Sequence, residues 1–85
     1  MNRIVFHVKR QYYEAIKRGE KTSEWRDSTV YWLNRLHPQR KEAWFVAGYP
    51  KNNLPRLEAE IVGMTGHAYS KQIEIKISNV KEITA

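Results

Sequence analysis

The sequence predicts an α+β fold in which five to six mainly antiparallel strands form a curled sheet that closes toward a small β-barrel. Apolar residues alternate with polar ones in several short segments, and one or two short helical patterns are confined to the N-terminal half. Strands and helices do not alternate strictly, as they would in a parallel α/β sheet. An 85-residue chain can build one core, so we expect a single domain over residues 1–85.

The first strand and helix are indicated by a change of period. Residues 4–8 alternate with period 2, which is typical of a strand with Ile4, Phe6 and Val8 on its apolar face. From residue 9 the period is 3.6, which predicts an amphipathic helix. Tyr12 and Tyr13 cannot both face the core from one helix, so one of them should be exposed or at a cleft. Gly19 stands where a C-cap glycine would end this helix.

Thr22 to Arg26 predicts a short second strand. Alternation puts Thr22, Glu24 and Arg26 on one face, with Ser23 and Trp25 on the other. Trp25 is the residue of this strand that we expect in the core.

A second short helix is predicted over residues 30–36. Asp27 and Ser28 are good N-cap residues before it, and Pro38 follows its end.

The second half predicts a central strand and two strands with one wet face each. Residues 43–47 are continuously apolar, so Trp44 and Phe45 are expected in the core. Residues 57–61 and 73–77 alternate between apolar and charged side chains. The turn-rich connection before these two strands carries Gly48, Pro50 and Pro55. The connection between them carries Gly63, Gly66, His67 and Tyr69. Val80 and Ile83 extend the last strand or add an edge strand.

The formal net charge of +6 lies entirely in the first half. Residues 1–41 carry ten Lys and Arg against four Asp and Glu, whereas residues 42–85 carry five of each. Such an excess either steers phosphate polyanions toward the protein or only keeps a small domain in solution.

Composition and motifs narrow the classes of protein to which the chain could belong. Without cysteine the chain forms no disulfide, and no apolar run is long enough for a membrane span or a signal peptide, so we expect a cytoplasmic protein with no membrane partner. His7, His37 and His67 are too scattered to predict a metal site. No phosphate-binding loop or catalytic triad signature occurs, and no cofactor is expected.

The segment GEKTSEWR, residues 19–26, is the strongest candidate site. A tight turn at Gly19 would aim Lys21 away from the regular structure, with Glu24 and Arg26 on one strand face nearby. A cation, a carboxylate and a guanidinium can bind a nucleobase edge or a phosphate, or polarise an amide. The alternative is an ordinary Glu24–Arg26 ion pair on a solvated strand.

These residues resemble a known signature. Gly19, Lys21, Thr22, Glu24 and Arg26, preceded by YYEAIKR, are similar to the G-x-K-T-x-E-x-R signature of the ASCH family in the PUA-like superfamily. The opening strand IVFHV, the Tyr-Trp pair, the apolar strand before a glycine and the Ile-rich closing strands follow the same order. The resemblance implies a small PUA-like barrel, with the signature lining a cleft that binds RNA or modified nucleosides.

The same resemblance implies an alternative, a small hydrolase. Some ASCH proteins deacetylate N(4)-acetylcytidine with a lysine at the position of Lys21, a threonine three residues later and a later glutamate, and others resemble ribonucleases. Here Glu24 stands at the threonine position. In an enzyme Lys21 and Glu24 would be catalytic. The candidates for the later glutamate are Glu58, Glu60 and Glu74.

Aromatic and basic residues beside the motif complete the predicted site. Unpaired bases stack on aromatic rings, and arginines can follow a phosphate backbone, although the basic run could equally be a solvated loop. The predicted nucleic-acid-binding residues are Lys21, Thr22, Glu24, Arg26, Tyr31, Trp32, Arg35, Arg40 and Tyr49, with Tyr69 and Lys41 as further candidates. A third possibility is a protein-interaction module that docks a partner by an edge strand of the neutral second half.

Overall fold

The computed structural model describes residues 3–36, 40–66 and 71–84, and these residues form five strands and two α-helices. The elements in chain order are β1 (Arg3–Val8), α1 (Arg10–Lys17), β2 (Ser23–Asp27), α2 (Val30–Leu36), β3 (Glu42–Ala47), a single 3-10 turn (Lys51–Asn53), β4 (Arg56–Thr65) and β5 (Gln72–Ile83). The predicted α+β class is therefore confirmed. His37, Pro38, His67 and Tyr69 lie outside the described residues.

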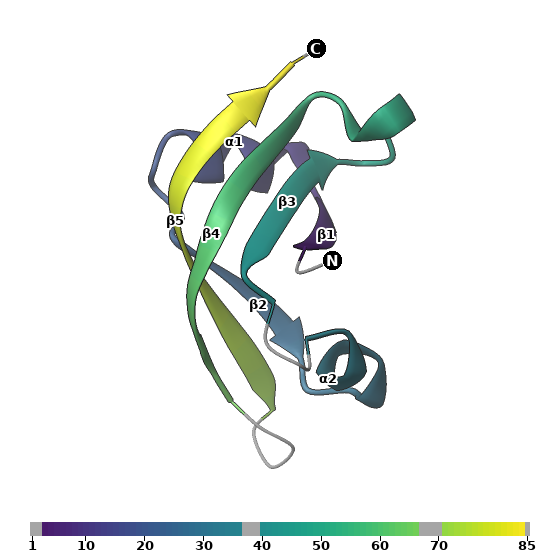
Figure 1. Ribbon diagram of the computed structural model, residues 1–85, viewed down its shortest axis with the longest axis vertical. Helices are drawn as coiled ribbons and strands as arrows, with labels where there is room; N and C mark the ends of the chain where they lie inside the picture. Colours follow the sequence, from purple (N-terminus) through teal and green to yellow (C-terminus); the bar gives the residue numbers. More distant parts are fainter. Residues whose placement is uncertain (1–2, 37–39, 67–70, 85) are drawn as a thin grey trace.

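All five strands belong to one sheet in the order β1-β3-β4-β5-β2. β1 and β3 are parallel, and the other three neighbouring pairs are antiparallel. Figure 1 shows β4 and β5 as long strands that curl together, with α1 behind their upper part and α2 beside the end of β2. The register of β4 and β5 shifts twice, between Glu58 and Glu60 and between Ile61 and Gly63, which adds the local bend that bulges produce.

The sheet is a curled half-barrel and does not close. β1 pairs only with β3, and β2 pairs only with β5, among the strands that the structure describes. The two edge strands both come from the first half of the chain, so the alternative of an edge strand in the second half is not found among the described residues. Val80 and Ile83 extend β5 instead of adding an edge strand.

The core lies on the concave face of the half-barrel and follows the predicted alternation. Ile4, Phe6 and Val8 are buried on β1, and the three isoleucines at 73, 75 and 77 are buried on β5. β3 lies between β1 and β4, as its continuous apolar run predicts.

Two of the three aromatic residues expected in the core are differently placed. Phe45 is fully buried, but Trp44 is only partly buried, between the guanidinium groups of Arg3 and Arg56. Trp25 is 47% exposed, so its assignment to the core is wrong.

α1 closes one side of the core through Tyr13. This side chain is buried while Tyr12 is exposed, which resolves the predicted conflict between the two neighbours. The Tyr13 hydroxyl donates a hydrogen bond to Glu82 Oε2 at 2.9 Å, and Lys17 Nζ lies 3.1 Å from the other oxygen of that carboxylate. Burial raises the pKa of the Tyr13 hydroxyl well above its usual value, and the hydrogen bond to Glu82 raises it further.

No helix of the described residues is long and apolar enough to cross a membrane.

Burial and the hydrogen bond of Tyr13 make the stability of the fold fall at alkaline pH. An unfolded tyrosine ionises near pH 10, but folded Tyr13 keeps its proton there, so the free energy of unfolding should fall as the pH rises above this value. Tyr13→Phe should lower that free energy by about 1 kcal/mol at neutral pH and flatten the alkaline fall. Urea unfolding at neutral and alkaline pH measures both effects. Tyr49→Phe, at a ring that is 86% exposed, is the control; an alkaline fall as steep in Tyr13→Phe as in the parent would contradict the assignment.

Candidate nucleic-acid interface

The turn after α1 sets the position of Lys21. Gly19 has a φ of +80°, which glycine adopts without strain, and its N–H donates to the carbonyl of Ile16 at 3.1 Å. The N–H groups of Glu20 and Lys21 both donate to the carbonyl of Ala15, at 2.9 and 3.1 Å. These bonds form a Schellman-type cap, as the sequence predicted for Gly19, and turn the chain directly into β2.

Glu24 is the buried charge of the motif. It is 5% exposed, and its two oxygens lie 3.4 Å from Lys21 Nζ and 2.8 Å from Arg26 Nη2. The ordinary ion pair predicted as the alternative therefore exists, but it is buried instead of solvated. Two cations around one carboxylate leave this group with a net positive charge.

Arg26 spans the opening between the two sheet edges. Its Nη2 is bonded to Glu24 and makes a longer contact of 3.5 Å with the carbonyl of His7 on β1. Its guanidinium carbon lies 5.0 Å from the ring centroids of both Phe6 and Trp32. Its Nε is buried without a hydrogen-bond partner among the described residues. Thus a side chain, and not backbone pairing, connects β2 to β1.

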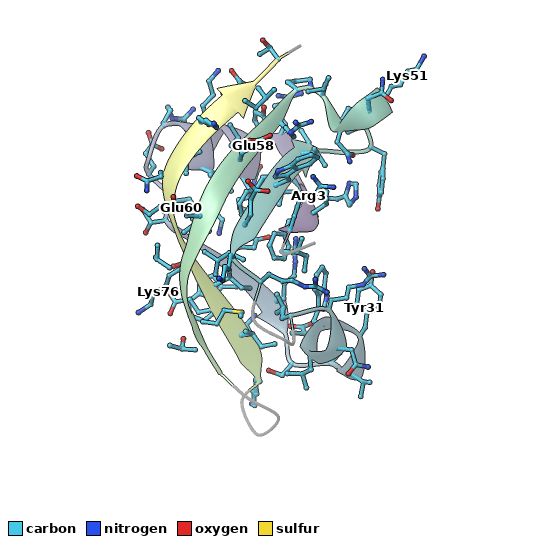
Figure 2. All side chains as sticks on the ribbon, in the orientation of Figure 1. Arg3, Tyr31, Lys51, Glu58, Glu60 and Lys76 are labelled. Carbon is cyan, nitrogen blue, oxygen red and sulfur yellow. The ribbon has the colours of Figure 1, made fainter. Side chains whose placement is uncertain are left out.

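A cleft of about 910 Å³ follows this opening, between β1, β2 and α2. Its described lining contains four arginines, four aromatic rings, one histidine and one carboxylate. These residues are Arg3, Arg26, Arg35, Arg40, Trp25, Tyr31, Trp32, Tyr49, His7 and Asp27. In Figure 2 Arg3 and Tyr31 lie on the same side of the molecule, and Glu60 and Lys76 lie on the other. The cleft is therefore both positively charged and rich in ring surface.

α2 carries one wall of the cleft. The helix begins after Thr29, whose Oγ1 accepts the N–H of Trp32 at 3.3 Å, so Thr29 takes the N-cap role predicted for Asp27 or Ser28. Trp32 stacks on Phe6 at 5.6 Å between ring centroids, and Tyr31 meets the Trp32 ring edge-on at 5.1 Å. Arg35 lies 4.3 Å above the Tyr31 ring. These contacts hold a cation and its aromatic neighbours in fixed positions.

His7 and Tyr49 form the opposite wall. Their rings stack with centroids 4.2 Å apart, and His7 Nδ1 lies 2.8 Å from the carbonyl oxygen of Gly48. Because a carbonyl only accepts hydrogen bonds, Nδ1 carries a proton and donates it. The sequence does not predict His7 at this site, because a single histidine on a strand gives no signal of a cleft.

A second, smaller depression of about 400 Å³ surrounds Lys21 and Glu24. Lys21 Nζ lies 5.5 Å from the ring centroid of Tyr12. Trp25 and Arg26 line both this depression and the larger cleft. The GEKTSEWR segment thus lies where the two depressions meet.

The structure does not bring every predicted residue to this surface. Thr22 is exposed beside a separate depression between α1 and β5, and its carbonyl accepts the N–H of Ile77 at 3.0 Å. Lys41 lines a further depression with Glu58 and Glu60. Arg40 lines the larger cleft, and its Nε donates to the carbonyl of Arg35 at 2.9 Å.

The three later glutamates have other partners. Glu58 pairs with Arg56 at 2.8 Å, and Glu60 accepts a hydrogen bond from Asn79 at 2.9 Å. Glu74 accepts hydrogen bonds from Ser23 at 2.7 Å and from Thr65 at 3.3 Å. None of the three lines the depression around Lys21.

Comparisons of the chain with models of protein families, with curated proteins and with solved structures found no match. Within the described ranges, no group of three or more His, Asp or Glu side chains is placed to hold a metal ion.

The Glu24 carboxylate should stabilise the fold because it compensates Lys21 and Arg26. Glu24→Ala leaves two partly buried cations without their counter-charge, so we expect the free energy of unfolding to fall by about 2 kcal/mol. Urea unfolding measures this loss. The control is Glu20→Ala, which removes the exposed partner of Arg18 and should leave stability unchanged. Equal losses in the two variants would show that Glu24 is solvated in solution.

Proposed function

We propose that this protein binds single-stranded RNA, or nucleosides derived from it, in the cleft between β1, β2 and α2. The observation that carries the proposal is the convergence of four arginines and four aromatic rings in one cleft, with a single carboxylate among its described lining residues. Arginines neutralise phosphates, and exposed rings stack unpaired bases. A surface that bound an acidic protein would need the charges but not the rings.

Rigid placement of the rings supports the proposal further. The wall formed by α2 is anchored through the stack of Trp32 on Phe6, which is itself stacked on Phe45 in the core at 5.3 Å. A ring fixed in this way loses little conformational entropy when a base stacks on it or beside it. Bases of a duplex are already stacked on one another, so single strands are the ligand that such a wall favours.

The motif gives the proposal its family context. We propose that the domain is ASCH-like and belongs to the PUA-like superfamily, with GEKTSEWR at the junction of the two depressions. The supporting features are the signature residues, the Schellman-type turn at Gly19 and the curled half-barrel. Lys21 and Arg26 then contact the bound nucleotide directly, and the buried Glu24 carboxylate holds both cations at the site.

Binding should depend on salt and on Arg35. Each phosphate contact on a single strand contributes about 0.7 to the slope of log affinity against log salt, so three to four contacts predict a slope of about −2 to −3. Arg35→Ala should weaken binding and reduce the slope by about 0.7. Fluorescence anisotropy of a labelled RNA oligonucleotide measures both. Lys76→Ala, on an exposed residue of β5, should change neither. Absence of binding at low salt, or equal effects of the two substitutions, would refute the proposal.

The Lys21–Glu24 pair favours holding a ligand over proton transfer. Lys21 Nζ is already engaged in an ion pair with Glu24 Oε1 at 3.4 Å, and none of the later glutamates lines the same depression to supply a further carboxylate. We therefore expect no turnover when the protein is incubated with N(4)-acetylcytidine or with RNA, measured by chromatography of the products. Turnover that disappears in Lys21→Ala would replace the binding proposal with the hydrolase alternative.

A further inference from the structure

Trp25 has an unusual position for a tryptophan on a strand. It is 47% exposed, and it lines both the larger cleft and the smaller depression around Lys21. His7 and Arg26 are the other residues that line both. These three side chains therefore form a wall that the two depressions share, and Trp25 provides its largest ring.

The Trp25 ring has no ring or cation partner among the described residues, unlike the other two tryptophans. Trp32 stacks on Phe6 and lies 5.0 Å from the Arg26 guanidinium. The ring of Trp44 has guanidinium carbons at 3.9 and 3.6 Å from its centroid. Packing accounts for Trp32 and Trp44, whereas the fold leaves the Trp25 ring available to a ligand.

Each side of this wall has its own cation and aromatic ring. On one side Lys21 Nζ lies 5.5 Å from the Tyr12 ring centroid, and on the other the Arg35 guanidinium lies 4.3 Å above Tyr31. One nucleotide needs a positive charge for its phosphate and a ring surface for its base. The two sides therefore repeat the same pair of binding functions across Trp25.

We propose that the two depressions are adjacent nucleotide subsites separated by Trp25. Two consecutive nucleotides of a single strand occupy them, with the Trp25 ring stacking against a base at their boundary. The inference rests on the proposed function and adds the size of the ligand to it. A dinucleotide is the smallest ligand that engages both subsites, and a mononucleotide fills only one.

A length series tests the proposal on the wild-type protein. A labelled octauridylate is displaced by uridine 5′-monophosphate and by the dinucleotide and trinucleotide that carry the same 5′-phosphate. One additional stacked base is worth about 5- to 150-fold in affinity, so we expect a gain of roughly tenfold or more from the mononucleotide to the dinucleotide. The gain from the dinucleotide to the trinucleotide should be smaller, about threefold or less, because the added unit meets no further subsite. Equal affinities for the mononucleotide and the dinucleotide would overturn the proposal.

Substitutions of Trp25 test whether its ring causes the gain in affinity from mononucleotide to dinucleotide. Trp25→Ala should reduce the step from mononucleotide to dinucleotide to about threefold or less, and Trp25→Phe should restore most of it. Trp44→Phe removes an indole that lines neither depression and should leave the step unchanged. Thermal unfolding confirms that each variant folds.

The outcomes separate this inference from the function on which it rests. If octauridylate binds but the Trp25→Ala variant keeps the full gain in affinity from mononucleotide to dinucleotide, the two-subsite arrangement is wrong and RNA binding stands. If octauridylate does not bind the wild-type protein at low salt, both fail.

Discussion

The side chain of Arg26 does what backbone pairing does in a closed barrel, because it joins the two free edges of the sheet. It is held by a 2.8 Å ion pair with Glu24 and lies against the rings of Phe6 and Trp32. A buried charge is tolerated only where its partner is also fixed, so Glu24 and Arg26 must be placed together. The strand alternation that separates them by two residues provides this placement.

Because the Arg26 side chain bridges the edges of β1 and β2, more space remains between these strands than backbone hydrogen bonds would leave. The opening between β1 and β2 is filled at one end by α2, which follows β2 after only two residues. This short connection brings Tyr31, Trp32 and Arg35 to the same opening. The incomplete barrel and the aromatic, basic cleft are thus one feature of the fold.

Much of the fold could be predicted from the sequence, because alternating Ile, Phe and Val residues define a strand and its buried face in one pattern. The exception is β2, where alternation is correct but the buried face is reversed. Hydrophobicity ranks Trp25 far above Glu24 for burial. The ranking fails because Lys21 and Arg26 compensate the Glu24 charge. The turn at Gly19 that places Lys21 is predicted by the sequence, but the open sheet edge beside Arg26 is not revealed by any local pattern. His7 and Arg3 were not predictable as site residues for the same reason, since they come from the edge strand opposite β2.

The charge asymmetry of the sequence becomes a spatial asymmetry in the fold. Arg3, Arg26, Arg35 and Arg40 all line the larger cleft. The second half carries equal numbers of acidic and basic residues; Glu58 pairs with Arg56 at 2.8 Å, and Glu60 lies on the side of the molecule away from Arg3. Under the proposed function, this cluster of arginines attracts a polyanion to the cleft before any contact forms. Part of the +6 excess is therefore gathered at one cleft, which is the arrangement that electrostatic steering requires.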